Sequence, residues 1–261
     1  MIKETIGEVY AVRNKKPPFE ITEAALSDVM EISELVGKIS SNQNLSASPI
    51  LRCQNRIRTI YSSLAIEQNI LSLEQVTAVL SGKRVLAPPK DIAEVKNAYE
   101  IYDHLAELNP YSIDDLLLAH RTMMQGLVRE AGEFRSRPVG AVDSKGNVLH
   151  FGTLPQYVPS LMEELVQWTE SSPFPLLIKS CVFHYEFEVI HPFADGNGRM
   201  GRLWHTLLLS KWNSLFAWLP IESIIHDHQP EYYAAINQSN AQGEGTVFIE
   251  FMLGVIKEAL Q

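Results

Sequence analysis

The segment LLIKSCVFHYEFEVI, residues 176–190, constrains the fold of this chain more than any other stretch. Almost every turn of it is apolar on most sides, a pattern typical of a helix surrounded by other helices. The rest of the chain offers such neighbours. Apolar residues recur at helical spacing over residues 25–39, 46–69, 72–82, 88–108, 112–127, 159–171, 199–213, 230–239 and 247–260. The sequence therefore predicts an all-α fold around a buried central helix over about residues 174–189.

Local signals support these helices and add one exception. Ser72 and Gln75 have the spacing of a capping box, and Ser112 is a plausible N-cap. The exception is VGAVDSKGNVLHF, residues 139–151, in which two short apolar runs flank a turn-rich centre. This pattern predicts one β-hairpin.

Composition and charge exclude several classes of function. The 261 residues are 46% hydrophobic, enough for a real core, and the net charge of −9 comes with no cationic arm, which disfavours nucleic-acid binding. The N-terminus lacks an apolar signal segment, and no stretch of about twenty apolar residues could span a membrane. Cys53 and Cys181 suit reduced thiols. We expect a cytoplasmic protein with neither nucleic acid nor membrane as a partner.

Directly after the central helix comes HPFADGNGRMGR, residues 191–202. The glycine-rich turn leads into a helix N-terminus, whose unpaired backbone N–H groups favour a phosphate. Arg199 and Arg202 lie three apart on one face and suit phosphate oxygens. Asp195 offers the oxygen ligand that Mg²⁺ accepts, and His191 could take a proton at neutral pH.

Each of these residues also has a plainer explanation, such as a helix end, a turn, a cap or a surface ion pair. A merely structural turn has no use for all of them together. Their joint occurrence predicts a site for nucleotide-phosphate transfer, where positioning and charge neutralisation supply most of the catalysis.

The same twelve residues fit without a break the signature of the Fic (filamentation induced by cAMP) family, His-Pro-Phe-x-Asp/Glu-Gly-Asn-Gly-Arg-x-x-Arg. The resemblance extends over roughly residues 90–260 and implies the Fic fold, with residues 1–89 as an N-terminal helical region and 90–261 as the core domain. Enzymes of this family typically transfer AMP from ATP to a protein Ser, Thr or Tyr hydroxyl and release pyrophosphate. Carried over by position, the resemblance assigns His191 as general base, Phe193 as the anchor of the loop, Asp195 as the Mg²⁺ ligand, Gly196, Asn197 and Gly198 as the anion hole, and Arg199 and Arg202 as phosphate ligands.

The hairpin resembles the family's flap, which follows a Gly-x-x-Arg lead-in at Gly132–Arg135. It would align a target segment by strand addition, a contact driven by the backbone and tolerant of sequence. The residues expected in this flap are Val139, Gly140, Ala141, Val142, Val148, Leu149, His150 and Phe151.

A second motif, SSLAIEQN at residues 62–69, places Ser63 and Glu67 on one helix face. An isolated glutamate is more often solvated or paired with a surface cation. This stretch, however, resembles the Fic inhibitory motif, Ser/Thr-x-x-x-Glu followed by Gly or Asn, and its N-terminal position implies a class II member. Glu67 would then hold Arg202 and exclude the γ-phosphate of ATP. Gln68 departs from the pattern, since it stands where Gly or Asn is usual.

The leading hypothesis is thus an autoinhibited protein adenylyltransferase with ATP and a target protein, or itself, as partners. One alternative is removal of AMP from a modified protein, with Glu67 positioning the attacking water. Another is a non-catalytic nucleotide-sensing interaction module, although such a protein has no need of His191. A homodimer that controls inhibition is a family-based expectation, while the target and the nucleotide base stay open.

Overall fold

The computed structural model describes residues 16–41, 48–142, 148–151 and 153–261. Helices dominate the described chain, and the prediction of an all-α fold is confirmed. The helices are α2 (Glu23–Ser41), α3 (Pro49–Ile66), α4 (Leu73–Leu80), α5 (Pro89–Asp103), α6 (Ile113–Met123), α7 (Val158–Ser171), α8 (Leu176–Ile190), α9 (Asn197–Trp212), α10 (Ile221–Asp227), α11 (Gln229–Gln242) and α12 (Thr246–Ala259), with 3-10 turns at Leu105–Glu107, Pro155–Tyr157 and Ser214–Ala217.

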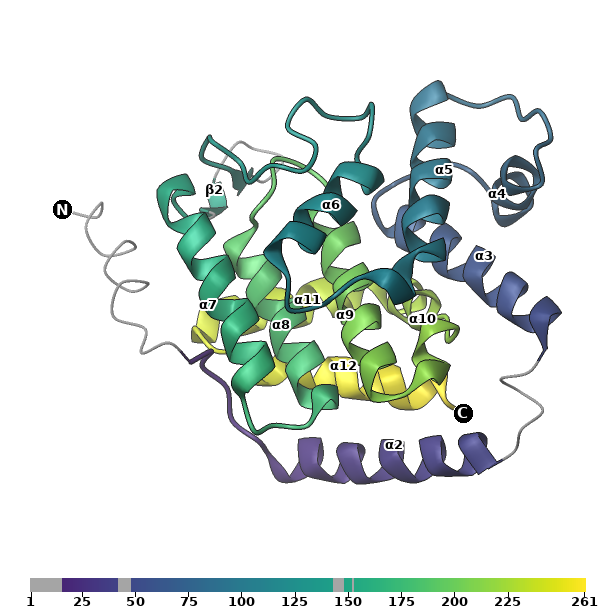
Figure 1. Ribbon diagram of the computed structural model, residues 1–261. Coiled ribbons are helices and arrows are strands. Elements are labelled where there is room, and N and C mark those ends of the chain that lie inside the picture. The colour runs from purple at the N-terminus through teal and green to yellow at the C-terminus, as the bar shows by residue number, and fades with distance from the viewer. Residues whose placement is uncertain (1–15, 42–47, 143–147, 152) are drawn as a thin grey trace.

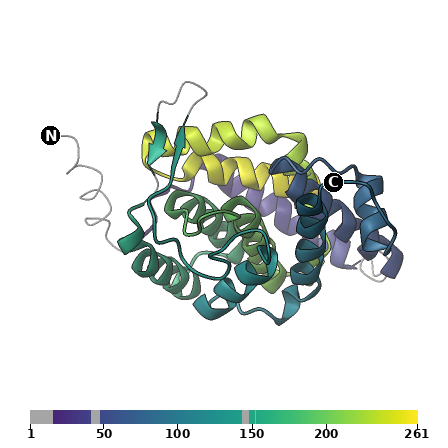
Figure 2. The ribbon, with the colours of Figure 1, turned by 90° about the horizontal axis from the view of Figure 1, so that it is seen from above.

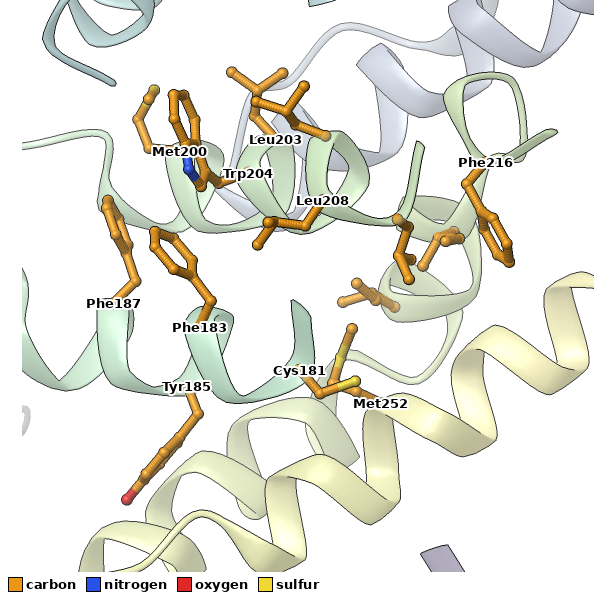
Figure 3. Packing of buried hydrophobic residues seen from close by; sticks show 14 of the residues in the cluster. Cys181, Phe183, Tyr185, Phe187, Met200, Leu203, Trp204, Leu208, Phe216 and Met252 are labelled. Atoms are coloured by element: carbon orange, nitrogen blue, oxygen red, sulfur yellow. The ribbon is translucent and has the colours of Figure 1, made fainter. Parts of the chain in front are cut away.

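Helix α8 is the central element that its apolar sequence predicts. Figure 3 shows Phe183 and Phe187 pointing from α8 toward α9, whereas Tyr185 points the opposite way and Cys181 lies near Met252 of α12. All five side chains are buried, and burying a phenylalanine contributes about 2 kcal/mol. On α9, Leu208 lies on the side toward α8, whereas Met200, Leu203 and Trp204 point away from α8, and all four side chains are buried. The α8–α9 pair is thus the rigid base from which the loop at residues 191–196 projects.

The N-terminal helices cover two sides of this base. Helix α2 runs along α12 at the bottom of Figure 1. Helices α3, α4 and α5 gather at one end of the molecule, and the two short strands lie at the other end (Figure 2). Because α3 packs against α5, α9 and α10, the residues near its C-terminus reach the start of α9. The division of the chain into domains at residue 89 stays a prediction.

Two strands occur where the sequence predicts a hairpin. β1 (Gly140–Val142) pairs antiparallel with β2 (Val148–Phe151), and Gly140 lies opposite Phe151 and Ala141 opposite His150. The register is irregular between Ala141 and Val142. Residues 143–147, the predicted turn, lie outside the described residues, and Val139 immediately precedes β1.

The structure departs from the sequence expectations in two places. Helix α10 forms over residues that the periodicity leaves unassigned, with His226 in its last turn. A helix of seven residues spans less than two turns, so its apolar spacing is too short to read. Helix α9 begins at Asn197, two residues earlier than expected, because Gly196 makes the turn with φ of +84°. Among the described helices, none is both long and apolar enough to cross a membrane.

Candidate functional site

The site begins where α8 ends. Ile190 is the last helical residue, and His191 follows in the left-handed region with φ of +52°. Two residues on, the fully buried Phe193 anchors the loop to the core. The Asn197 side chain closes the loop, since its Oδ1 accepts from the backbone N–H of Phe193 and its Nδ2 donates to the carbonyl of Phe193, both at 2.8 Å. The loop therefore has a fixed shape from its first residue to the start of α9.

His120 of α6 packs against the same loop. Its ring stacks on Phe193 with centroids 3.6 Å apart and planes 2° from parallel. The ring Nδ1 accepts from the backbone N–H of Gly132, so Nε2 carries the proton and donates to the carbonyl of Asp195 at 3.0 Å. Burial lowers the pKa of His120 to about 4, which agrees with this neutral form. No pattern in the sequence indicates these contacts, because His120 and Asp195 lie 75 positions apart.

Arg135 holds the end of α8. The side chain is 2% exposed and donates hydrogen bonds to four carbonyls: those of Ile190 and His191 at 3.3 and 2.6 Å, that of Arg137 at 3.0 Å, and that of Thr153. The final carbonyls of a helix have no partner within the helix, so a buried guanidinium is well suited to them. Arg135 is the arginine of the Gly-x-x-Arg lead-in, and it ties α8 to both ends of the β1–β2 segment.

The segment SSLAIEQN, residues 62–69, contacts the loop motif, residues 191–202, at Arg202. This side chain is 1% exposed, and its Nη2 donates to Glu67 Oε1 at 2.8 Å and to the carbonyl of Ser63 at 2.9 Å, while Nε lies 3.2 Å from Ser63 Oγ. Burial is the largest single influence and lowers the pKa of Arg202, but Glu67, Tyr232 and Glu188 together raise it above its ordinary value. The structure thus brings together the three residues that the sequence placed in one inhibitory contact, across 135 positions of the chain.

Gln68 is the residue at which the chain departs from the inhibitory motif. It adopts the left-handed conformation with φ of +65°, which Gly or Asn adopts more easily. Its N–H bonds to the carbonyl of Ala65, and that of Asn69 to the carbonyl of Leu64, at 2.9 and 3.1 Å. These two bonds form a Schellman motif that ends α3 at Glu67. The backbone geometry is therefore present even though the usual residue is not.

Arg199, the other predicted phosphate ligand, has partners of its own. Its Nη1 donates to Glu94 Oε1 of α5 at 3.1 Å, and its Nη2 to Asp195 Oδ1 at 3.2 Å. Arg199 and Glu94 are 4% and 6% exposed, so this ion pair is buried. Glu94 was not among the sequence-predicted site residues, and the 105 positions between the partners leave no spacing signal.

Gly196 and Gly198 are glycines because their neighbours come very close. A Cβ on Gly196 would lie 2.6 Å from Met124 Sδ, and its φ of +84° disfavours other residues. A Cβ on Gly198 would collide with Glu67 Oε1 and stand 3.1 Å from Arg202 Nη1. The same lack of a side chain that favours a close phosphate thus lets the Glu67 carboxylate lie against the first turn of α9.

The Asp195 carboxylate has a position that fits Mg²⁺. Its side chain is 51% exposed, and Oδ1 accepts from the backbone N–H of Gly196 at 2.6 Å as well as from Arg199. No group of three or more His, Cys, Asp or Glu side chains gathers within the described residues. Mg²⁺ is commonly held by one or two carboxylates and completes its shell with phosphate and water oxygens. A partly exposed carboxylate at the glycine turn before α9 meets that requirement.

A cavity of about 310 Å³ lies next to the loop, on the side of the strands. It reaches from Ala194 in the loop to Val139, the first residue of the predicted flap. Val128, Arg129, Glu130, Arg135 and Arg137 complete its lining.

Comparisons with known proteins agree with this geometry. Residues 110–209 match the sequence model of a protein family described as "Fic/DOC family". A crystal structure of a Fic family protein from Desulfovibrio desulfuricans G20 is 48% identical with a TM-score of 0.89, over 94% of this chain and 75% of that one.

Some relatives of lower sequence identity have names that state an activity. The protein adenylyltransferase fic-1 of Caenorhabditis elegans is 30% identical over 207 residues, which are 74% of this chain and 38% of that protein. The chain therefore spans less than half the length of this curated relative. A solved structure of Caenorhabditis elegans Fic-1 has the same fold, with a TM-score of 0.70 at 23% identity. With its complete loop motif, its fold and its 48% identity to a solved Fic family protein, the chain belongs to the Fic/DOC family.

Proposed function

We propose that this chain is a protein adenylyltransferase, which transfers AMP from ATP to a Ser, Thr or Tyr hydroxyl of a target protein or of itself. The observation that carries the proposal is the fixed loop between α8 and α9, which brings His191, Asp195 and two buried arginines to one helix N-terminus. Relatives named protein adenylyltransferase support the reaction class.

In the proposed reaction the target hydroxyl oxygen attacks the α-phosphorus of ATP. The bond from that phosphorus to the bridging oxygen breaks, and pyrophosphate leaves. The hydroxyl proton passes to the imidazole of His191, whose backbone Arg135 and the end of α8 hold in place. In the anion hole proposed for Gly196, Asn197 and Gly198, the N–H groups of Asn197 and Gly198 would bind the phosphates, since that of Gly196 donates to Asp195 Oδ1. Arg199 and Arg202 would neutralise the phosphate charge.

Asp195 would hold Mg²⁺ at the α- and β-phosphates. When bound, the ion offsets phosphate charge and supports the leaving pyrophosphate. The Asp195 Oδ1 contacts with Gly196 and Arg199 orient the carboxylate for that task.

We further propose that the enzyme as it stands is autoinhibited by Glu67. A guanidinium that is paired with a carboxylate cannot also bind a phosphate, and the Arg202 side chain is almost fully enclosed. The Glu67 side chain is one-third exposed, so it can leave this contact at a lower cost than Arg202 can. In this proposal ATP binds without a correctly placed γ-phosphate until Glu67 moves away.

For the target, we propose that the β1–β2 segment adds a strand of the substrate protein at its edge, beside the cavity that contains Ala194 and Val139. A homodimer that controls the inhibitory contact is part of the same proposal.

The test measures transfer of label from α-labelled ATP to the protein itself and to a lysate. Glu67→Gly is expected to raise labelling at least about tenfold, the equivalent of 1.4 kcal/mol of released inhibition. Glu67→Gln, which keeps the size and removes the charge, should raise labelling in the same direction. Adding His191→Ala to Glu67→Gly should abolish labelling.

Two outcomes would contradict the proposal. Unchanged labelling in Glu67→Gly would remove Glu67 from its inhibitory role. ATP binding by calorimetry without any transfer in that variant would instead favour a nucleotide-sensing module. Incubating the labelled protein without ATP checks the reverse reaction, since loss of AMP would indicate a removing enzyme.

A further inference from the structure

Asn69, two residues beyond Glu67, fastens the end of α3 to α5. Its Nδ2 donates to Glu94 Oε2 at 2.8 Å and to the carbonyl of Asp91 at 3.2 Å. Its Oδ1 accepts from the backbone N–H of Leu71 at 3.1 Å. Together with the Schellman bond of its own N–H, these contacts use every polar group of Asn69 except its carbonyl. Asn69 therefore connects the end of α3 to α5 through hydrogen bonds and is not a solvated loop residue.

Glu94, the acceptor in this junction, is buried and bonded through both carboxylate oxygens. One carboxylate oxygen accepts from Asn69 and the other from Arg199, and the side chain is 6% exposed. Lys90 approaches the same carboxylate from the surface, with 3.8 Å between Nζ and Oε1. A hydrogen bond to a buried, ionised carboxylate is stronger than one between neutral groups. The end of α3 is thus bonded to a charged group of α5 that also pairs with Arg199 of α9.

The spacing gives this tie a consequence for Glu67. Two residues of extended chain reach about 7 Å, so Glu67 and Asn69 cannot move independently over larger distances. Glu67 contacts Arg202 of α9, and Asn69 contacts Glu94, which pairs with Arg199 of the same helix. A movement of the end of α3 that withdraws Glu67 from Arg202 therefore pulls on the bond from Asn69 to Glu94.

We propose that the Asn69–Glu94 hydrogen bond is a second inhibitory tie, which keeps Glu67 on Arg202 by fixing the end of α3. The proposal rests on the proposed function and adds a positioning residue to its regulation. In this proposal Asn69 acts through Glu67, because Arg199 bonds to the other carboxylate oxygen of Glu94 and does not compete with Asn69.

Asn69→Asp is the sharpest test, since it preserves shape and the acceptor for Leu71 but turns the donor that faces Glu94 into a carboxylate oxygen. With Glu67 in place, labelling from ATP is expected to rise about tenfold, the lower end for a hydrogen bond to a charged group. In the Glu67→Gly background the same change is expected to alter labelling by less than about twofold, because no inhibition is left to release.

Asn213→Asp is the matched control. Asn213 also accepts from a backbone N–H two residues on, that of Leu215, and donates to a side chain, Ser40 Oγ, but it lies at the far end of α9. This variant is expected to leave labelling unchanged. Asn69→Ala removes the hydrogen bond to Glu94 without adding charge and should also raise labelling. It replaces Asn69→Asp as the test if Asn69→Asp does not fold.

A second readout needs no catalysis. Amide hydrogen exchange of residues 64–69 should become faster in Asn69→Asp than in the unaltered protein, because the end of α3 opens more often. Unchanged labelling and unchanged exchange in the folded variants would overturn the proposal. An equal rise in both Glu67 backgrounds would also overturn it, since the effect would not pass through Glu67. A Glu67→Gly protein that never labels speaks against the proposed function, whereas faster exchange would still support the tie.

Discussion

At the scale of single residues, Gln68 is the position where the chain accepts conformational strain. It ends α3 with φ of +65°, a conformation that costs a residue with a Cβ about 1 kcal/mol relative to glycine. Gln68→Gly is therefore expected to raise the free energy of unfolding by about 0.5–1 kcal/mol, reduced somewhat by the entropy of the glycine in the unfolded chain. Urea unfolding of both proteins measures this difference.

Gln167→Gly is the control, because Gln167 lies exposed in the interior of α7 with ordinary helical geometry. There the same substitution should lower the free energy of unfolding by about 1 kcal/mol. If Gln68→Gly also destabilises the protein, the left-handed conformation is not what limits this position.

At the scale of elements, the end of α8 depends on a side chain from outside the helix. Arg135 donates to the carbonyls of Ile190, His191, Arg137 and Thr153 in a buried setting, which a single ammonium group cannot reproduce. Arg135→Lys is expected to lower the free energy of unfolding by about 2 kcal/mol, since each hydrogen bond to a charged donor contributes about 1.5–3 kcal/mol and some survive. Urea unfolding measures the loss.

Arg137→Lys, on an exposed side chain two residues away, is the comparison and should change stability by less than about 0.5 kcal/mol. Equal effects of the two substitutions would mean that the carbonyl contacts of Arg135 add nothing to the end of α8.

The packing of helices against one another limits which contacts can be predicted from the sequence. The central helix, the capping box at Ser72 and Gln75, and the glycine turn at residue 196 follow from local patterns, and the structure confirms them. The pairing of Glu67 with Arg202 could be expected only through a family resemblance, because nothing in the spacing of two segments 135 residues apart relates them. Glu94 carries no such signal, so its contacts with Arg199 and Asn69 emerge only when α3, α5 and α9 are packed.

At the scale of the whole molecule, buried histidines make stability depend on pH. Burial lowers the pKa of His120 and of His205 to about 4 and that of His184 well below its ordinary value of 6.5. Below pH 6.5 the unfolded chain binds these protons while the folded protein stays neutral at the three sites. Their contribution to stability is therefore complete above pH 6.5 and is lost as pH falls toward 4.

Two buried carboxyl groups oppose this trend. Burial raises the pKa of Glu188 to about 7, so between about pH 4.5 and 7 the folded protein holds a proton there that the unfolded chain releases, and burial raises the pKa of Glu222 in the same direction. Their contribution is present at low pH and lost as pH rises. The three histidines outnumber the two carboxyl groups, so unfolding takes up protons between about pH 6.5 and 4.5 and stability is expected to fall as pH falls. Urea unfolding at pH 7.0, 6.0 and 5.0 measures this slope, and a stability that is flat or that rises as pH falls would mean that the histidines are protonated in the folded core.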